Sequence, residues 1–241
     1  MIRTAYFDAA GTLFDSREPI GRTYARIARD FGVDASEDEV AASFRQVFRA
    51  ADGLAFGLGH PAAELRHLER EWWRSRVAST FASLGKFRDF EGYFEALFGY
   101  FADPAHWEAF PEARGALQRL KDRGLKLGVI SNFDYRLYRI LDGLDLTRYF
   151  DSVSISSEVG YAKPSREIFD AALARLDSTA GDAMHIGDSE HLDFAAAESA
   201  GIVAVLVDRD RAETAPAIAA RSARISSLAQ VLEVGRVFGF A

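Results

Sequence analysis

The segment TAYFDAAGTLFDS, residues 4–16, poses the question on which the fold and function of this chain depend. It begins as a short apolar run typical of a buried β-strand and ends in one carboxylate, Asp8, before a Gly-Thr turn. An Asp at a strand end is usually a turn or helix-capping residue, and Ala10, two positions later, has no functional group. Whether Asp8 takes part in chemistry therefore depends on what the other strands bring to the same sheet edge.

The composition excludes several classes of function. The chain has 241 residues, enough for one large domain or for a core with a smaller companion, and its 49% hydrophobic and 27% charged residues are ordinary for a globular protein. Its net charge of −7 argues against nucleic acid as a partner. Because it contains no cysteine and no metal-binding pair among its five histidines, a transition-metal site is not expected. We find no signal peptide and no run near the ~20 apolar residues of a membrane span, so we expect a cytoplasmic protein without a membrane partner.

Strand and helix patterns alternate over much of the chain. Amphipathic segments, several ending in Gly, separate the apolar runs and predict helices. This alternation predicts an α/β fold, a Rossmann-like doubly wound parallel sheet with helices on both faces. The predicted strands lie at residues 2–7, 125–132, 152–156, 183–189 and 203–208.

The middle of the chain has a different pattern. Residues 15–110 contain no convincing strand, and their aromatic side chains recur at helical spacing, as expected for packing between helices. We therefore predict an α/β core, residues 1–14 and 111–241, interrupted by an all-helical cap domain, residues 15–110. The predicted cap helices lie within residues 19–32, 36–51, 61–85 and 88–102.

Polar side chains gather at one edge of the predicted sheet. Open parallel sheets bind ligands beyond the carboxyl ends of their strands. Each of these side chains alone is better explained as a turn, a cap or a solvated residue, but together they favour a site. They are Asp8, Ser131, Asn132 and Asp188 at strand ends, Lys163 in a loop before a helix, and Asp193 five residues after Asp188.

Four segments resemble the four ordered sequence motifs of the haloacid dehalogenase-like hydrolase superfamily. They are FDAAGTLFD (7–15), VISNFD (129–134), AKPSREIF (162–169) and HIGDSEHLDFAAAESAG (185–201). The resemblance covers nearly the whole chain, and finer stretches such as EPIGRTYARIARDFG (18–32) are similar to one subfamily.

This resemblance implies a Mg²⁺-dependent hydrolase of small phosphorylated molecules, in which Asp8 forms an aspartyl-phosphate. It implies that Mg²⁺ is held by Asp8, the backbone carbonyl of Ala10 and Asp188, with Asp193 supporting the ligands from behind.

The resemblance also implies how the phosphoryl group is bound. Ser131, Asn132 and Lys163 would contact its oxygens, with Lys163 also counted as catalytic because it offsets the developing charge. Thr12 would belong to the same phosphate-binding group and orient the loop that follows Asp8.

Ala10 departs from the pattern of the superfamily's phosphatases, which usually carry a second Asp there as general acid and base. The absence of this general acid and base lowers the expected rate of hydrolysis by roughly 10²–10⁴-fold. Four residues could replace this acid, but each has a better explanation. Asp134 is better explained as a helix cap, Glu190 as a solvated loop acid and His185 as a core histidine, and Asp15, at the hinge into the cap, is the weakest candidate.

Several functions remain open because of Ala10. The protein could be a slow phosphatase, or one for good leaving groups such as acyl or aryl phosphates. It could be a 2-haloacid dehalogenase, or a phosphonatase-like hydrolase, for which Lys86 is the one cap lysine. It could also be a catalytically impaired module that binds a phosphate ligand. Either a monomer or a homodimer is compatible with the sequence.

Overall fold

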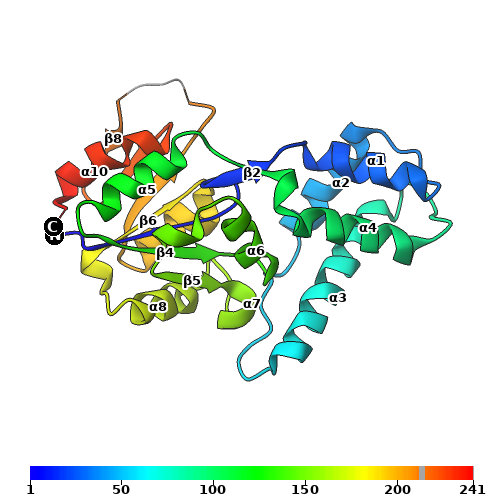
Figure 1. Cartoon of the computed structure of the whole chain (residues 1–241), viewed down its shortest axis with the longest axis horizontal. Coiled ribbons are helices and arrows are strands. Elements are labelled where there is room, and N and C mark those ends of the chain that lie inside the picture. The colour runs from blue at the N-terminus through cyan, green and yellow to red at the C-terminus, as the bar shows by residue number, and fades with distance from the viewer. Residues whose placement is uncertain (212–214, 241) are drawn as a thin grey trace.

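The computed structural model describes residues 1–211 and 215–240 and contains a sheet covered by helices, with a helical part to one side (Figure 1). Seven strands form the sheet in the order β5-β4-β1-β6-β7-β9-β8. All neighbours pair in parallel except β8, which is antiparallel to β9. The strands are β1 (Thr4–Phe7), β4 (Lys126–Ser131), β5 (Ser152–Ile155), β6 (Ala183–Gly187), β7 (Val203–Val207), β8 (Ala217–Ile218) and β9 (Ser222–Ile225).

The strand order confirms the predicted doubly wound fold. The chain starts at β1 in the middle, adds β4 and β5 on one side, and then crosses over to add β6, β7 and β9 on the other. The carboxyl ends of β1 and β6 therefore lie where the strand order reverses, which is where such sheets bind ligands. The pairing of Phe7 with Ile186 brings Asp8 and Asp188 to that point.

Alternation along β1 builds the two layers that cover the sheet. Ala5 and Phe7 belong to the hydrophobic core under α5, α6 and α10, whereas Tyr6 belongs to the core under α8 and α9. The core helices are α5 (Ala113–Lys121), α6 (Arg136–Gly143), α7 (Ser156–Val159), α8 (Arg166–Arg175), α9 (Ala196–Ser199) and α10 (Val231–Phe238).

Four helices within residues 20–102 have a hydrophobic core of their own, as predicted for the cap. Tyr24, Phe81 and Tyr93 are buried together in it. Ser36 begins the second helix with a capping box, which satisfies otherwise unpaired backbone N–H groups. The helices are α1 (Ile20–Asp30), α2 (Glu37–Arg49), α3 (Ala62–Phe81) and α4 (Phe90–Ala102).

The prediction that residues 15–110 contain no strand is wrong. Strand β2 (Phe14–Ser16) pairs antiparallel with β3 (Trp107–Ala109), and together they connect the sheet to the helical part (Figure 1). A strand of three residues is too short to show a period of two, and its partner lies far along the chain. Strand β8, with two residues, was missed for the same reason. Strand β9 was missed although it has four residues, because Ser222 and Arg224 interrupt its apolar residues. The domain boundaries at 14/15 and 110/111 remain predictions, and they lie at this strand pair.

Within residues 1–211 and 215–240, every helix is either too short or too polar to cross a lipid bilayer.

Candidate active site

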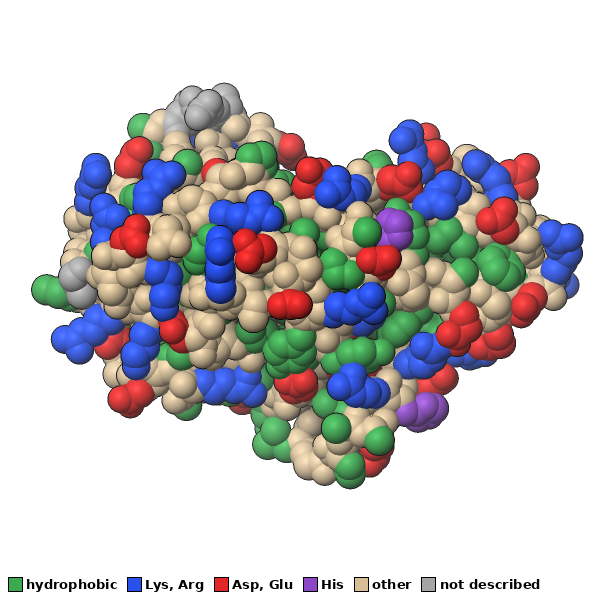
Figure 2. Space-filling model, in the orientation of Figure 1, with side chains coloured by type: hydrophobic (Ala, Val, Ile, Leu, Met, Phe, Trp, Pro, Cys, Tyr) green, Lys and Arg blue, Asp and Glu red, His purple; other side chains and the backbone are tan. Residues whose placement is uncertain are grey.

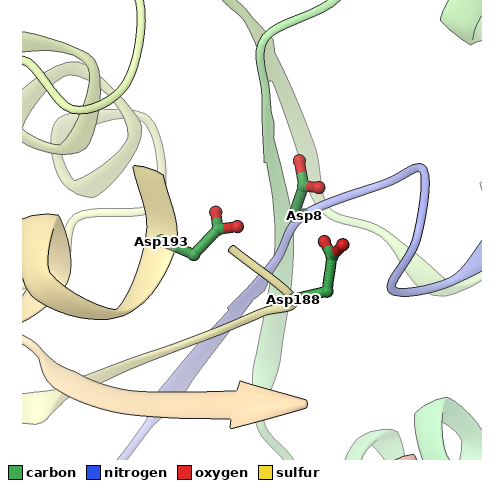
Figure 3. Close-up of side chains that lie close together, drawn as sticks. All are labelled: Asp8, Asp188 and Asp193. Atoms are coloured by element: carbon green, nitrogen blue, oxygen red, sulfur yellow. The ribbon is translucent and has the colours of Figure 1, made fainter. Parts of the chain in front are cut away.

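Three carboxylates meet at the reversal point of the sheet. Asp8 follows β1, Asp188 follows β6, and Asp193 lies on the helical segment η4 (Glu190–Ala195). Each offers an oxygen within 4.8 Å of the others, and the side chains converge in the close-up view (Figure 3). The structure thus brings together the three acids that the sequence placed at one edge.

The ammonium of Lys163 lies between two of these acids. Its Nζ donates to Asp8 Oδ1 at 2.7 Å and to Asp193 Oδ1 at 2.6 Å, and the residue is only 3% exposed. Burial disfavours a charged lysine, but Asp193 and Asp8 together outweigh this effect and raise the pKa of Lys163. The side chain is therefore a fixed positive charge at the site.

The loop that carries Lys163 is held by the neighbouring strand end. Asn132 accepts a hydrogen bond from the Lys163 backbone N–H at 2.8 Å and donates to its carbonyl at 2.9 Å. Both polar ends of this amide are thus engaged with backbone, so its side chain positions Lys163.

Asp193 is a fully satisfied, buried carboxylate. Its Oδ1 accepts from Lys163 and from His185 Nε2 at 2.9 Å, and its Oδ2 accepts from the Ser189 N–H at 3.1 Å. Burial opposes ionisation of Asp193, but Lys163 and His185 hold its pKa well below the usual range. A Cβ at Gly187 would lie 2.2 Å from Asp193 Cγ, so only glycine allows the carboxylate to pack here. Asp193 is thus positioned to orient Lys163.

Asp188 lies at the solvent edge of the cluster. The residue is exposed as a whole, yet its carboxylate is crowded, because Thr12 Oγ1 donates to Oδ1 at 3.2 Å and Gly11 packs against it. Gly11 has φ +85°, and a Cβ there would lie 2.4 Å from Asp188 Oδ2. Burial of the carboxylate and the negative charges of Asp8 and Asp193 raise the pKa of Asp188 to about 6.

The cluster has more negative than positive charge. Lys163 compensates one of its three carboxylates, and burial raises the pKa of Asp8 although the nearby ammonium opposes this. A hard divalent cation takes carboxylate and carbonyl oxygens and would relieve the repulsion. Because the oxygens of Asp193 are already used, Asp8 and Asp188 are the side chains best placed to hold such an ion.

The remaining predicted phosphate-binding residues lie at the same edge. Ser131 is the last residue of β4, the strand that pairs with β1, and it is buried. Thr12 is also buried, and its hydroxyl is engaged with Asp188. That Ser131, Thr12 and Asn132 bind phosphate stays a prediction.

Two contributors to the site were missed from the sequence. His185 is buried, as predicted for a core histidine, but it also donates to Asp193. Arg209, which follows β7, donates to the Thr12 carbonyl at 2.8 Å, to the Gly11 carbonyl at 3.3 Å and to Glu112 at 2.7 Å. The position of Arg209 after a predicted strand could have indicated that it lies at the site, because the same kind of position indicated Asp188.

The acids considered as replacements for a second Asp are already engaged. Asp134 is buried against Arg136 at 2.6 Å and accepts from Trp73 Nε1 at 2.6 Å. It also accepts from the backbone N–H of Arg136, the first residue of α6, although the N-cap of that helix is Tyr135 and not Asp134 as expected. Glu190 pairs with Arg224 at 2.7 Å. Neither carboxylate is free to take over the role missing at Ala10.

A cleft of about 510 Å³ lies between the cap helices and the core beside Lys163. The upper outline of the molecule has a notch where these two parts meet (Figure 2). The exposed cap lysine, Lys86, is absent from the lining, so it is not placed for phosphonatase chemistry. The lining of the cleft includes Phe48, Trp72 and Trp73 from the cap helices and Asn132 and Lys163 from the core.

Two curated proteins are similar to this chain. Haloacid dehalogenase-like hydrolase domain-containing protein 3 of Mus musculus is 35% identical over 214 residues, covering 86% of this chain and 82% of that protein. This is the subfamily that the finer sequence features resemble. Ribulose-1,5-bisphosphate 5-phosphatase of Halopiger xanaduensis is 34% identical over 127 residues, covering 49% of this chain and 53% of that protein.

Solved structures share the fold. The HAD phosphatase from Thermococcus onnurineus matches with a TM-score of 0.65 and 24% identity over 99% of both chains. The L-2-haloacid dehalogenase from Xanthobacter autotrophicus matches with a TM-score of 0.70 and 21% identity over 100% of both. Because one fold carries both chemistries, these likenesses do not choose between them. The family described as haloacid dehalogenase-like hydrolase matches residues 2–201, and this chain belongs to that family.

Proposed function

We propose that the protein is a Mg²⁺-dependent phosphatase of small phosphorylated molecules that uses Asp8 as its nucleophile. The observation that carries the proposal is the convergence of Asp8, Asp188 and Asp193 at the reversal point of the sheet, with the Lys163 ammonium bonded to Asp8 and Asp193. The similarity to a curated phosphatase supports the same reaction class.

Each residue of the site has its own role in the proposed phosphoryl transfer. An Asp8 oxygen attacks phosphorus, the bond to the leaving oxygen breaks, and water then hydrolyses the aspartyl-phosphate to release inorganic phosphate. Lys163, held by Asp193, offsets the negative charge that builds up on the phosphoryl oxygens. Ser131 and Asn132 extend the same phosphate site from the end of β4, and Thr12 holds Asp188 in place.

The donor set fits Mg²⁺, with Asp8, the Ala10 carbonyl and Asp188 as protein ligands and Asp193 as their support. When bound, Mg²⁺ neutralises charge on the transferring phosphoryl group. We propose neither a nucleic acid nor a membrane as partner, since acidic and basic side chains are interspersed on the face shown in Figure 2. We propose the cytoplasm as its compartment.

Turnover of 4-nitrophenyl phosphate is expected to depend on Mg²⁺. Removal of the ion with a chelator should lower the rate by at least about 10²-fold, because the carboxylate cluster then repels the substrate dianion. The rate is measured by release of 4-nitrophenolate as Mg²⁺ is titrated back.

Parallel measurements separate the alternatives. Equal turnover with and without Mg²⁺ would contradict the proposal. Chloride release from 2-chloropropionate in the presence of chelator would indicate a dehalogenase. Phosphate binding without any turnover across a panel of phosphate esters would indicate the binding module.

The variant Ala10→Asp is expected to accelerate hydrolysis of alkyl phosphates by at least about 10²-fold, because it restores a general acid for a poor leaving group. Hydrolysis of 4-nitrophenyl phosphate should change much less, since its leaving oxygen departs without a proton. An unchanged alkyl phosphate rate in a folded Ala10→Asp protein would mean that Ala10 does not limit the reaction.

A further inference from the structure

Beside the proposed phosphate site, the cleft between cap and core has a wall of three aromatic rings. Phe48 comes from α2, and Trp72 and Trp73 come from α3. The two indoles lie 5.1 Å apart at 79°, and Phe48 lies 5.8 Å from Trp72 at 74°. From the sequence Trp72 and Trp73 were expected to pack between helices. Trp73 does pack against the hydrophobic core of the cap helices, and both rings also border the cleft.

We propose that the protein hydrolyses phosphate esters of planar aromatic hydroxyl compounds, with the ring of the leaving group held against Phe48, Trp72 and Trp73. This inference rests on the proposed phosphatase function and names its substrate class.

The position of the cleft supports this substrate class. Its lining includes Asn132 and Lys163, and Lys163 is bonded to Asp8, so the cleft adjoins the place where a phosphoryl group would meet the nucleophile and offers space for a leaving group. The volume of about 510 Å³ is in the range of small-molecule sites. A planar ring matches an aromatic wall because ring faces and edges attract one another.

One ring of the wall, Trp73, is held in place by a hydrogen bond to the core. Trp73 Nε1 donates to Asp134 Oδ2 at 2.6 Å, and Asp134 is itself held by the buried guanidinium of Arg136. Arg136 also lies 4.9 Å from the ring centroid of Trp73. The Trp73 ring is thus tied to the segment that follows Ser131 and Asn132, so it keeps its place relative to the phosphate site.

Ala10 supports the same class independently. Without a general acid beside the nucleophile, the leaving oxygen must depart as an anion. A phenol such as tyrosine has a pKa of about 10, whereas an aliphatic hydroxyl resembles water, with a pKa near ~16. Among these two kinds of ester, only the phosphate ester of a phenol has both a leaving group that departs without a general acid and a ring that can contact the aromatic wall. Acyl phosphates also release a stable anion, but they offer no ring to the wall.

The step balances without an external acid. The Asp8 carboxylate forms a bond to phosphorus, and the bond between phosphorus and the aryl oxygen breaks, leaving its electron pair on that oxygen. The aryloxide takes a proton from water after it leaves. A second water hydrolyses the aspartyl-phosphate and regenerates Asp8.

The test compares kcat/KM with Mg²⁺ for phenyl phosphate, cyclohexyl phosphate, 4-nitrophenyl phosphate and acetyl phosphate. Phenyl phosphate should exceed cyclohexyl phosphate, which is of similar size, by at least about 10²-fold. In Trp72→Leu the ratio of kcat/KM for 4-nitrophenyl phosphate to that for acetyl phosphate should fall about tenfold. Phe48→Leu is measured in the same way if Trp72→Leu does not fold.

The matched control is Phe90→Leu, which removes a partly buried cap aromatic outside the cleft and should leave this ratio unchanged. Preference for acetyl phosphate, or an unchanged ratio in the folded cleft variant, Trp72→Leu or its substitute Phe48→Leu, would overturn the inference while the phosphatase function stands. Absence of turnover with all four compounds would instead overturn the proposed function.

Discussion

Replacement of Asp8 by Asn is expected to lower kcat for 4-nitrophenyl phosphate by on the order of 10⁴-fold or more, as loss of a nucleophile does in other hydrolases. An amide has nearly the shape of a carboxylate but lacks its negative charge and its nucleophilic oxygen. Lys163 keeps Asp193 as a partner in this variant, so the fold should persist. The rate is measured in single-turnover and steady-state assays on protein whose folding is verified by circular dichroism.

The control for this experiment is Asp15→Asn, the same change on β2 at an exposed position. It should keep nearly the full rate. Within the described residues, the side chain of Asp15 accepts one hydrogen bond, from the backbone N–H of Ser16. Turnover that survives in Asp8→Asn would remove the proposed nucleophile, whatever the control does.

Replacement of Lys163 by Met is expected to destabilise the fold by about 3–5 kcal/mol, because it leaves two buried carboxylates without their shared cation. For a chain of this length, that corresponds to a fall in Tm of roughly 6–20 °C. Mg²⁺ should raise the Tm of the variant more than that of the parent, since the ion supplies positive charge that the variant lacks. Thermal unfolding followed by circular dichroism, with and without Mg²⁺, gives both values.

Lys121→Met is the matched control, because Lys121 also bridges a carboxylate, Asp151 at 2.9 Å, but at the surface. Such an exposed pair is worth about 0–1 kcal/mol. Equal shifts in Tm for Lys163→Met and Lys121→Met would contradict the placement of Lys163 between Asp8 and Asp193.

The site could be predicted largely from local sequence because its residues follow strands. Asp8, Ser131 and Asp188 each come directly after a short apolar run, and parallel strands end at a common edge. The cap helices were equally visible, since eleven to twenty residues show a helical period clearly.

Contacts between distant segments could not be predicted in this way. The pairing of β2 with β3, the bond from Trp73 to Asp134 and the anchoring of the Gly11 loop by Arg209 all join residues from separate parts of the chain. The hydrophobic periodicity of a segment does not indicate its distant partners, because each of these contacts depends on how the packed helices and strands are placed in space.

The sequence by itself determined the fold class, the helical insertion and the identity of the acids and the lysine at the sheet edge, because strand and helix periods are local properties of the chain. Only the tertiary structure decided that His185 supports Asp193 and that Trp72 and Trp73 border a cleft. The physical reason is that a buried or aromatic side chain has the same pattern in the sequence whether it packs in a core or borders a ligand site, and only its neighbours in space distinguish the two.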